Sequence, residues 1–552
     1  MSISLEKSGR DNFQFVPLEE DSASPPVCLE RDSDEELKTK ARPAVNSSST
    51  YTIEDAVEAA GLGCFQLRLF LICGILTAAD AMEMLLLSIL GPALRCAWHL
   101  TSNEVAAMTT VVFVGYLLGS PFWGFVSDRF GRWPIFFTVL SMIAYYGFLT
   151  ALSPTYVWVI ILRLMVGFAI GGGSSSFTLL SEYLPVKHRA KVLICFQVFW
   201  AIGSTFEVGL AYLILPRFGW RWLVFASAVP LVLFLFLLKF LPESPRYLVT
   251  ANRLSEAEHI VQNMFRVNGV RPPEGRLTTS TVTDPFSIRR FLRNRRKSKR
   301  CSRLLELFSK QYRLTTVLLP TIWFGAAFAY YGVVLLSAEI FRFRQDCYRT
   351  SSLHPVSSDK NLTAASIQAS IVHQVVPHQD VSCCQELTDS DFVTMIVSSV
   401  GEFVNIPIIV ILIDLLGRKI TMGIWNGITG LMFFILYICM SRQAMTGVLF
   451  GVRAMAAALL SLAYVYTGEV FPTTVRALAI GIFSSVSRLG AMTTPYVAQV
   501  MLPEYSEIGA LSLYAAISLL CAVLSFVLPI ETAGRELPSS VERSTIEHHR
   551  RA

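Results

Sequence analysis

The sequence contains few charged residues. Only 16% of its 552 residues are Asp, Glu, Lys or Arg and 53% are hydrophobic, whereas an average soluble domain is about 25% charged. This composition excludes a water-soluble globular protein. Eleven cysteines are too few for a disulfide framework, and a net charge of +6 gives no reason to expect nucleic-acid binding. The remaining class is a protein that crosses a lipid bilayer many times.

Long apolar runs are abundant instead. From Leu69 onward they recur with lengths of about 20 residues, enough to cross a hydrocarbon core about 30 Å thick as a helix. Polar or Pro/Gly-containing breaks separate them. We therefore expect an all-α membrane protein with twelve transmembrane helices, six before a long interruption and six after it. The expected spans are 69–91, 105–126, 134–152, 156–178, 191–215, 222–241, 314–337, 392–413, 420–440, 447–467, 477–500 and 509–530.

Basic residues indicate the orientation of these helices. The segment from Arg289 to Arg313 holds eleven basic residues and one acid, Glu306. Lys and Arg concentrate in cytosolic loops of membrane proteins, so this segment and, with an even helix count, both termini are expected in the cytosol. The expected organisation is a disordered cytosolic tail at 1–60, a six-helix bundle at 61–241, a cytosolic basic loop at 242–313, a second six-helix bundle at 314–535 with an outward-facing loop at 338–391, and a cytosolic tail at 536–552.

The loop at 338–391 is expected in the lumen of a vesicle or outside the cell. It contains Asn361 in an Asn-Leu-Thr acceptor for N-glycosylation, and we expect Asn361 to be modified. An oxidising compartment would also permit disulfides. Their pairing stays open among Cys96, Cys347, Cys383 and Cys384.

The two halves of the chain share motifs at a constant separation. Segments 182–189 and 469–476 both read Glu-x-x-Pro-x-x-x-Arg and lie 287 residues apart, and segments 128–132 and 414–418 both read Asp-x-x-Gly-Arg and lie 286 residues apart. Such a common register indicates a duplicated six-helix unit. Parallel repeats of this kind build transporters whose substrate site lies near the middle of the membrane, between the halves.

These motifs also resemble a known family. The loop 124–132 is similar to the signature loop of the major facilitator superfamily, and 242–246 resembles the motif after the sixth helix in its sugar and organic-ion branches. Segments 79–84, 198–203 and 329–332 look like those of the synaptic vesicle 2-related transporters. The resemblance implies two pseudo-symmetric six-helix bundles and secondary active transport by alternating access. It does not specify the substrate.

By the same resemblance, the duplicated loops form cytosolic charge clusters that hold the outward-facing state closed on the inside. The alternative is a set of ordinary surface ion pairs, each contributing less than about 1 kcal/mol. The expected gate residues are Gly124, Asp128, Arg129, Gly131, Arg132, Glu182, Arg189, Glu243, Asp414, Gly417, Arg418, Glu469, Arg476 and Glu531.

Ionisable residues within the spans are the candidates for a transport site, because each costs at least roughly 2.5 to 3.5 kcal/mol to insert. Asp80 and Arg163 fall at similar depths and are expected to pair, and Glu83 lies one helical turn from Asp80. Proton-coupled sugar porters use such a pair, so by resemblance Asp80 would bind the proton, and Arg163 would release the Asp80 side chain once it is protonated. The alternative is a static pair that fixes helix packing.

Further residues are expected to line the cavity. Arg453 is the counterpart of Arg163 in the second repeat, and Arg488 resembles the arginine that faces the substrate in organic-anion transporters. Tyr330 and Tyr331 have rings that can stack on a substrate or hold a cation. The expected substrate or coupling residues are Asp80, Glu83, Arg163, Glu207, Tyr330, Tyr331, Glu402, Asn405, Arg453 and Arg488.

Other patterns carry no chemistry. Gly167-x-x-x-Gly171 is a small-residue packing face of a membrane helix. The sequence contains no nucleophile–base set and no metal-ligand spacing, so we expect neither an enzyme nor a cofactor. The expected function is proton-coupled transport of a small organic ion or solute, with no nucleic-acid partner. The alternative is a transport-silent membrane glycoprotein that acts as a receptor or vesicle-trafficking partner. By resemblance the protein is expected in a secretory or synaptic vesicle membrane, with the plasma membrane as the alternative.

Overall fold

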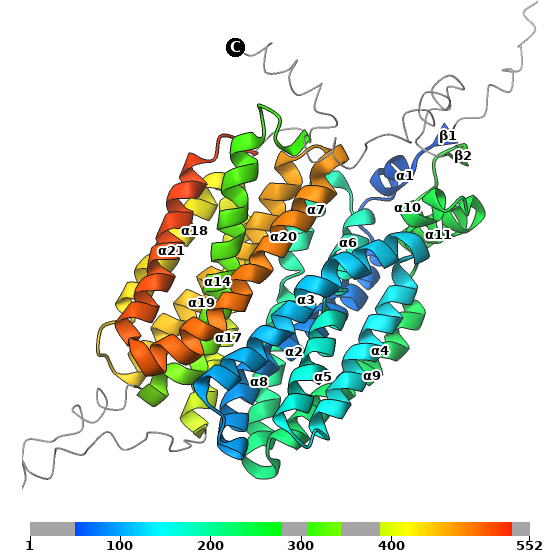
Figure 1. The fold of residues 1–552 in the computed structure, drawn as a ribbon. Helices are drawn as coiled ribbons and strands as arrows, with labels where there is room; N and C mark the ends of the chain where they lie inside the picture. Colours follow the sequence, from blue (N-terminus) through cyan, green and yellow to red (C-terminus); the bar gives the residue numbers. More distant parts are fainter. Residues whose placement is uncertain (1–49, 279–305, 344–386, 533–552) are drawn as a thin grey trace, which may run out of the picture. The chain divides into compact units, whose positions relative to one another are not determined.

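A computed structural model describes residues 50–278, 306–343 and 387–532. The expected glycosylation site Asn361, three of the candidate disulfide cysteines and the tail at 536–552 lie outside the described residues. The described chain is mainly helical and confirms the expected fold class (Figure 1).

The first half of the chain forms six rods, three of which are built from two consecutive helical pieces. The rods are α2 (Cys64–Trp98), α3 (Ser102–Phe130), α4 (Arg132–Ala151), α5 (Tyr156–Ile170) with α6 (Ser174–Glu182), α7 (Val186–Cys195) with α8 (Val198–Phe218), and α9 (Trp220–Leu237) with a short 3-10 turn, η1 (Leu238–Phe240).

The second half forms six more. They are α14 (Arg313–Phe343), α17 (Asp389–Leu415), α18 (Arg418–Ile435), α19 (Arg442–Val470), α20 (Thr473–Tyr496) with the π-helical segment η3 (Val497–Tyr505), and α21 (Glu507–Val527). Each expected span overlaps one of these twelve rods. In the described residues, ten of these rods are long and apolar enough to cross a membrane by length and composition alone. The other two, α18 and α20, are the ninth and eleventh rods.

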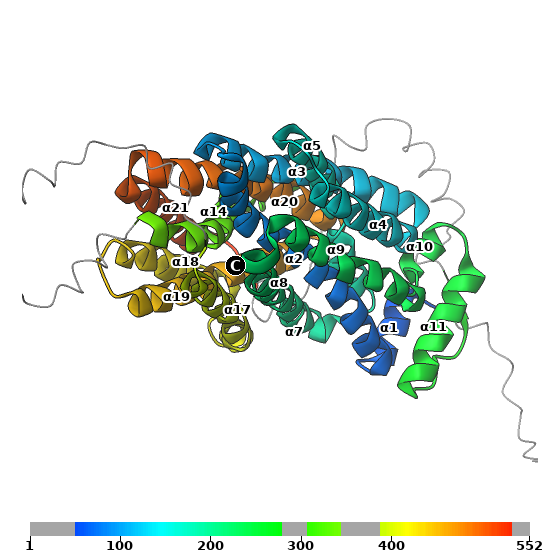
Figure 2. The same cartoon turned by 90° about the horizontal axis from the view of Figure 1, so that it is seen from below.

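Helix packing repeats between the halves. In the first half α2 packs on α8, α3 on α5 and α4 on α9; in the second, the corresponding pairs are α14 with α20, α17 with α19 and α18 with α21. The halves meet mainly where α3 contacts α20 and α8 contacts α17. Figures 1 and 2 show the first half in blue to green beside the second half in green to red.

Small residues allow α3 and α5 to approach closely. A side chain added at Gly115 or Gly119 of α3 would collide with the α5 backbone, and one added at Gly167 of α5 would collide with the Val112 carbonyl of α3. This contact is the packing face that the sequence predicts. Without a hydrophobic driving force between lipid-embedded helices, such close backbone contact is a main source of their association.

The tail expected over 1–60 extends too far, because residues 50–60 are structured. β1 (Thr50–Tyr51) pairs in parallel with β2 (Arg276–Leu277). Thr52 caps α1 (Ile53–Ala60), and the hydrogen bonds that Thr52 donates lower the pKa of Asp55. α1 buries one apolar face against α11 (Leu254–Asn268), a helix of the basic loop. The order of this segment therefore depends on residues about 200 positions away.

The α3–α5 contact predicts a difference between two glycine-to-alanine substitutions. Gly167→Ala should lower the stability by about 1 to 3 kcal/mol, because the new methyl group meets backbone that cannot move aside. Gly209→Ala in α8 is the matched control, since nothing lies within 4 Å of the added atom and alanine favours a helix more than glycine does. Unfolding temperatures of the detergent-solubilised variants measure both; equal values would contradict the contact.

Candidate functional site

A cavity of about 1450 Å³ lies between the two halves. α2, α3, α6, α7 and α8 line it from the first half, and α14, α17, α19 and α20 from the second. It reaches the end of the bundles at which the two Asp-x-x-Gly-Arg loops lie, which we call the motif end. Exposed side chains such as that of Asp128, 72% exposed, form its mouth there.

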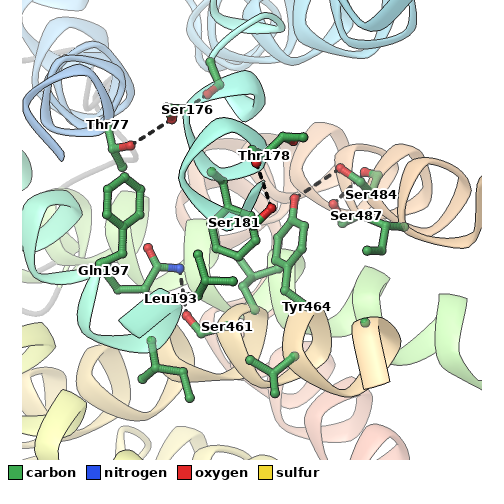
Figure 3. A pocket seen from close by; sticks show the side chains of 18 of the residues that line it. Thr77, Ser176, Thr178, Ser181, Leu193, Gln197, Ser461, Tyr464, Ser484 and Ser487 are labelled. Atoms are coloured by element: carbon green, nitrogen blue, oxygen red, sulfur yellow. Dashed lines mark hydrogen bonds between the residues drawn. The ribbon is translucent and has the colours of Figure 1, made fainter. Parts of the chain in front are cut away.

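Polar side chains from both halves line the walls (Figure 3). Within the first half the hydroxyls of Thr77 and Ser176 lie 3.2 Å apart. Gln197 Nε2 donates across the halves to Ser461 Oγ at 2.8 Å. The cavity can therefore hold water or a polar solute, with apolar rings such as Phe177 beside the polar groups.

Asp80 of α2 faces this cavity. Its carboxylate is partly exposed, and the described residues offer it no hydrogen-bond or ion-pair partner. It lies against Gly173 in the break between α5 and α6, where an added side chain would collide with the carboxylate. The expected pair between Asp80 and Arg163 is wrong.

Glu83, rather than Asp80, is the partner of Arg163. Arg163 Nη1 donates to Glu83 Oε2 at 3.0 Å, and the two side chains are 0% and 2% exposed. Three residues along an α-helix leave two side chains about 60° apart, which is enough to turn Glu83 toward α5 while Asp80 faces the cavity. Neither Glu83 nor Arg163 lines the cavity.

Glu207 does not line the cavity either, contrary to expectation. Its side chain is buried between α8 and α9, where Ser227 Oγ donates to Glu207 Oε1 at 2.6 Å. The carboxyl group therefore belongs to the interior of the first half.

The second half contains a buried ion pair of which Glu402 lines the cavity; Arg453 lies behind it and, contrary to expectation, does not line the cavity. Arg453 Nε donates to Glu402 Oε1 at 2.7 Å, and Arg453 is fully buried. The Tyr330 hydroxyl donates to the same oxygen at 3.2 Å, and Trp200 Nε1 of the first half donates to the Tyr330 hydroxyl at 2.5 Å. Asn405 lines the cavity and donates to the Ala454 carbonyl. The sequence predicts neither the pairing of Glu402 with Arg453 nor the bond to Trp200.

Arg488 faces a tyrosine of the other half. Its Nη2 donates to the Tyr116 hydroxyl at 2.6 Å, and its guanidinium carbon lies 3.7 Å from the centroid of that ring. Tyr331 lines the cavity next to Arg488 in the same wall and contacts the Phe113 ring at 4.8 Å between centroids. Aromatic rings and hydrogen bonds thus partner Arg488 across the interface.

The end opposite the motif end, which we call the far end, is bridged between the halves. Arg95 Nη1 of α2 lies 3.5 Å from Glu339 Oε2 of α14. Thr109 of α3 donates to Gln499 at 3.4 Å, and Thr110 donates to the Met492 carbonyl at 3.2 Å. Arg95 and Glu339 lie beyond the ends of the expected spans, so they are not among the intramembrane charges that the sequence predicts.

At the motif end, the first half holds a charge cluster. Arg132 pairs with Asp128 at 3.0 Å and with Glu182 at 3.6 Å. Glu243 accepts from the backbone N–H of Arg132 at 2.7 Å. Gly131 permits this geometry, because its φ of 99° is unfavourable for other residues and a side chain there would meet Glu243.

The second half repeats this cluster. Arg418 pairs with Glu469 at 3.0 Å, and Glu531 accepts from the Arg418 N–H at 2.9 Å. Gly417 again has a positive φ, 85°. Asp414 departs from the repeat, because it pairs across the halves with Lys191 at 2.7 Å.

The other expected gate residues make no ion pair in the described part of the chain. Arg189 and Arg476 each donate to the carbonyl five residues earlier, at 2.9 and 3.1 Å, and both line the cavity mouth. The Arg129 carbonyl accepts from Tyr247, and Gly124 lines the mouth. Apart from the pair between Asp414 and Lys191, the ion pairs of each cluster thus lie within one half.

Cysteines differ between the two ends. Cys96 and Cys439 near the far end are disulfide-bonded, whereas Cys64 at the motif end is free and exposed. Cys439 is not among the disulfide candidates that the sequence predicts.

Two family models and several relatives match this sequence. Residues 39–341 match the family model described as "Sugar (and other) transporter", and residues 387–550 match "Major Facilitator Superfamily". "Synaptic vesicle 2-related protein" of Pongo abelii is 40% identical over 497 residues, covering 90% of this chain and 84% of the relative. "Putative transporter SVOPL" of Homo sapiens is 37% identical and covers 90% of this chain and 95% of the relative.

Solved structures share the fold. The partially occluded inward-open conformation of the xylose transporter XylE from E. coli has a TM-score of 0.58 at 16% identity, covering 86% of this chain and 100% of that one. The proton:xylose symporter XylE bound to 6-bromo-6-deoxy-D-glucose has a TM-score of 0.56 at 18% identity, covering 86% and 98%. The chain belongs to the major facilitator superfamily, within the group of synaptic vesicle 2-related transporters.

Proposed function

We propose that the protein is a secondary active transporter that moves a small organic ion or solute by alternating access, with Asp80 binding the coupling proton. The observation that carries this proposal is the cavity between the repeats, which opens at the motif end, is bridged at the far end and is lined by Asp80, for which the described residues offer no hydrogen-bond or ion-pair partner. A carboxylate that faces water inside a membrane protein can exchange protons, which a permanently paired one cannot do without breaking its pair.

The relatives support the same proposal. XylE is described as a proton:xylose symporter, so a small solute and a proton are reasonable cargoes for this fold. Fold likeness does not carry a substrate over, and the charges of Asp80 and Arg488 admit either sign of organic ion. The vesicle-related names of the relatives favour a vesicle membrane over the plasma membrane.

In this proposal the motif end faces the cytosol, so the described state is inward-facing. The basic loop residues favour that orientation. The disulfide-bonded Cys96 and Cys439 support an oxidising compartment at the far end, and the free Cys64 suits the reducing cytosol at the motif end. When the cavity opens to the far end instead, the two charge clusters of the motif end would meet, and Arg189 and Arg476 would form their ion pairs across the halves.

Neutralising Asp80 should uncouple transport from the proton gradient. We expect Asp80→Asn in reconstituted vesicles to lose uptake driven by an imposed pH gradient, because the amide cannot bind a proton. A screen of organic cations, organic anions and sugars measures uptake. Glu256→Gln, on an exposed surface pair, is the control. Correctly folded parent protein that takes up no compound of any class would favour the transport-silent receptor instead.

The Glu83–Arg163 pair should behave as a static packing element. Glu83→Leu or Arg163→Met alone should destabilise the protein by about 3 to 5 kcal/mol, because each leaves a buried charge unpaired, whereas the double variant should recover most of the stability. Arg253→Ala, which breaks an exposed pair, should cost less than about 1 kcal/mol. Unfolding temperatures measure the stabilities, and a double variant as unstable as the singles would contradict a static pair.

The orientation can be tested at two positions. In sealed vesicles whose cytosolic face points outward, Cys64 should react with a membrane-impermeant maleimide without detergent. Asn361→Gln should abolish the mass shift that glycosidase treatment causes in the parent. Labelling of Cys64 only after permeabilisation would reverse this topology. A mass shift in Asn361→Gln as large as that in the parent would refute it.

A further inference from the structure

Four side chains form a hydrogen-bonded line across the inner wall of the cavity. Trp200 of α8 donates to Tyr330 of α14 at 2.5 Å, Tyr330 donates to Glu402 of α17 at 3.2 Å, and Arg453 of α19 donates to the same Glu402 oxygen at 2.7 Å. Trp200 belongs to the first half of the chain and the other three belong to the second. The line is therefore a bond between the two halves, anchored at one end on a buried ion pair.

The donors and acceptors in this line can be arranged in one way only. An indole N–H donates and cannot accept, and an ionised carboxylate accepts and cannot donate. The Tyr330 hydroxyl has a single proton, which it gives to Glu402, and its lone pairs are left for Trp200. If Glu402 lost its charge or its position, the hydroxyl proton would no longer be held away from the indole N–H, and the oxygen would be a poorer acceptor for Trp200.

Burial makes Glu402 depend on Arg453. Glu402 is 4% exposed and Arg453 is 0% exposed, and a carboxylate removed from water in this way stays ionised only beside a partner. Asn405, one turn along α17, also binds the α19 backbone and holds α17 in register. The Arg453 guanidinium thus fixes the charge and position of Glu402, and Glu402 fixes the hydroxyl of Tyr330.

The equivalent arginine of the first half has no such connection. Arg163 pairs with Glu83 inside its own half, and neither side chain lines the cavity. Trp200, Tyr330 and Glu402 all line it. In the proposed alternating access the two halves move against each other, so we expect the Trp200–Tyr330 bond to be made in one state and lost in the other.

We propose that Glu402 and Arg453 are positioning residues that act through Tyr330: the buried pair holds the Tyr330 hydroxyl as the acceptor for Trp200 and so stabilises the state that is open at the motif end. This inference rests on the alternating access of the proposed function. It assigns the pair a role in the balance between the two states, without contact with the substrate.

The test measures that balance directly. Spin labels on Thr155→Cys and Tyr505→Cys, exposed far-end positions of the first and second halves, report the far-end separation by electron–electron double resonance in full-length protein in lipid, with the other free cysteines replaced by serine. We expect the parent to show mainly the short distance. Trp200→Phe, Tyr330→Phe and Glu402→Gln should each shift the ratio of short to long distances by about threefold to tenfold, the effect of one hydrogen bond.

A double-mutant cycle separates positioning from general disruption. Because Glu402 acts through Tyr330 on Trp200, Glu402→Gln should cause no further shift in the Trp200→Phe background. The control is Trp323→Phe, which also removes an indole donor, but one that bonds to Thr467 within the second half; it should leave the distances unchanged. Tyr330→Phe retains the ion pair and decides the matter if Glu402→Gln fails to fold.

The outcomes distinguish this inference from the proposed function. Additive shifts in the cycle, an effect of Trp323→Phe equal to that of Trp200→Phe, or no shift in Tyr330→Phe would overturn the positioning role while transport stands. A parent with one fixed distance and no uptake would overturn alternating access itself. The inference is supported if Trp200→Phe shifts the ratio of distances and Glu402→Gln causes no further shift when added to it.

Discussion

The organisation of this protein depends on the cost of placing an ionised side chain inside a bilayer. A charge in the membrane interior needs a partner or contact with water, and each choice constrains the surrounding helices. Arg163 with Glu83 and Arg453 with Glu402 meet this need by pairing, which fixes the rotation of α5 against α2 and of α19 against α17. Asp80 meets it by facing the cavity.

The same cost explains where the halves are joined. Within each half, close backbone contacts at glycines and buried ion pairs restrict how the helices can pack against one another. Between the halves, the described polar contacts are single hydrogen bonds, the stacking of Arg488 on Tyr116, an exposed ion pair at the motif end and a largely buried one at the far end. Individually modest bonds of this kind can be exchanged without unfolding either half, as relative movement of the halves requires.

Contacts within each half are similar in the two copies of the repeat, whereas contacts between the halves differ. Arg132 and Arg418 stand in matching clusters, each beside a glycine with positive φ. Asp414, in contrast, pairs with Lys191 of the first half. Glu402 accepts a hydrogen bond from Tyr330, which connects it to the first half. Contacts across the interface join surfaces that the duplication does not make equivalent, so they can differ between its two copies.

The helices, the repeat and the family can be predicted from the amino-acid order, because hydropathy, helix length and motif spacing are local along the chain. Arg163 and Arg453 can be recognised as membrane arginines in the same way. The folded chain was needed to show that Glu83 rather than Asp80 pairs with Arg163 and that Glu402 pairs with Arg453. It was also needed to show that Glu207 turns away from the cavity and that residues 50–60 are ordered against β2 and α11. These outcomes depend on how each helix is rotated and tilted against its neighbours, and contacts between residues far apart in the chain set that rotation.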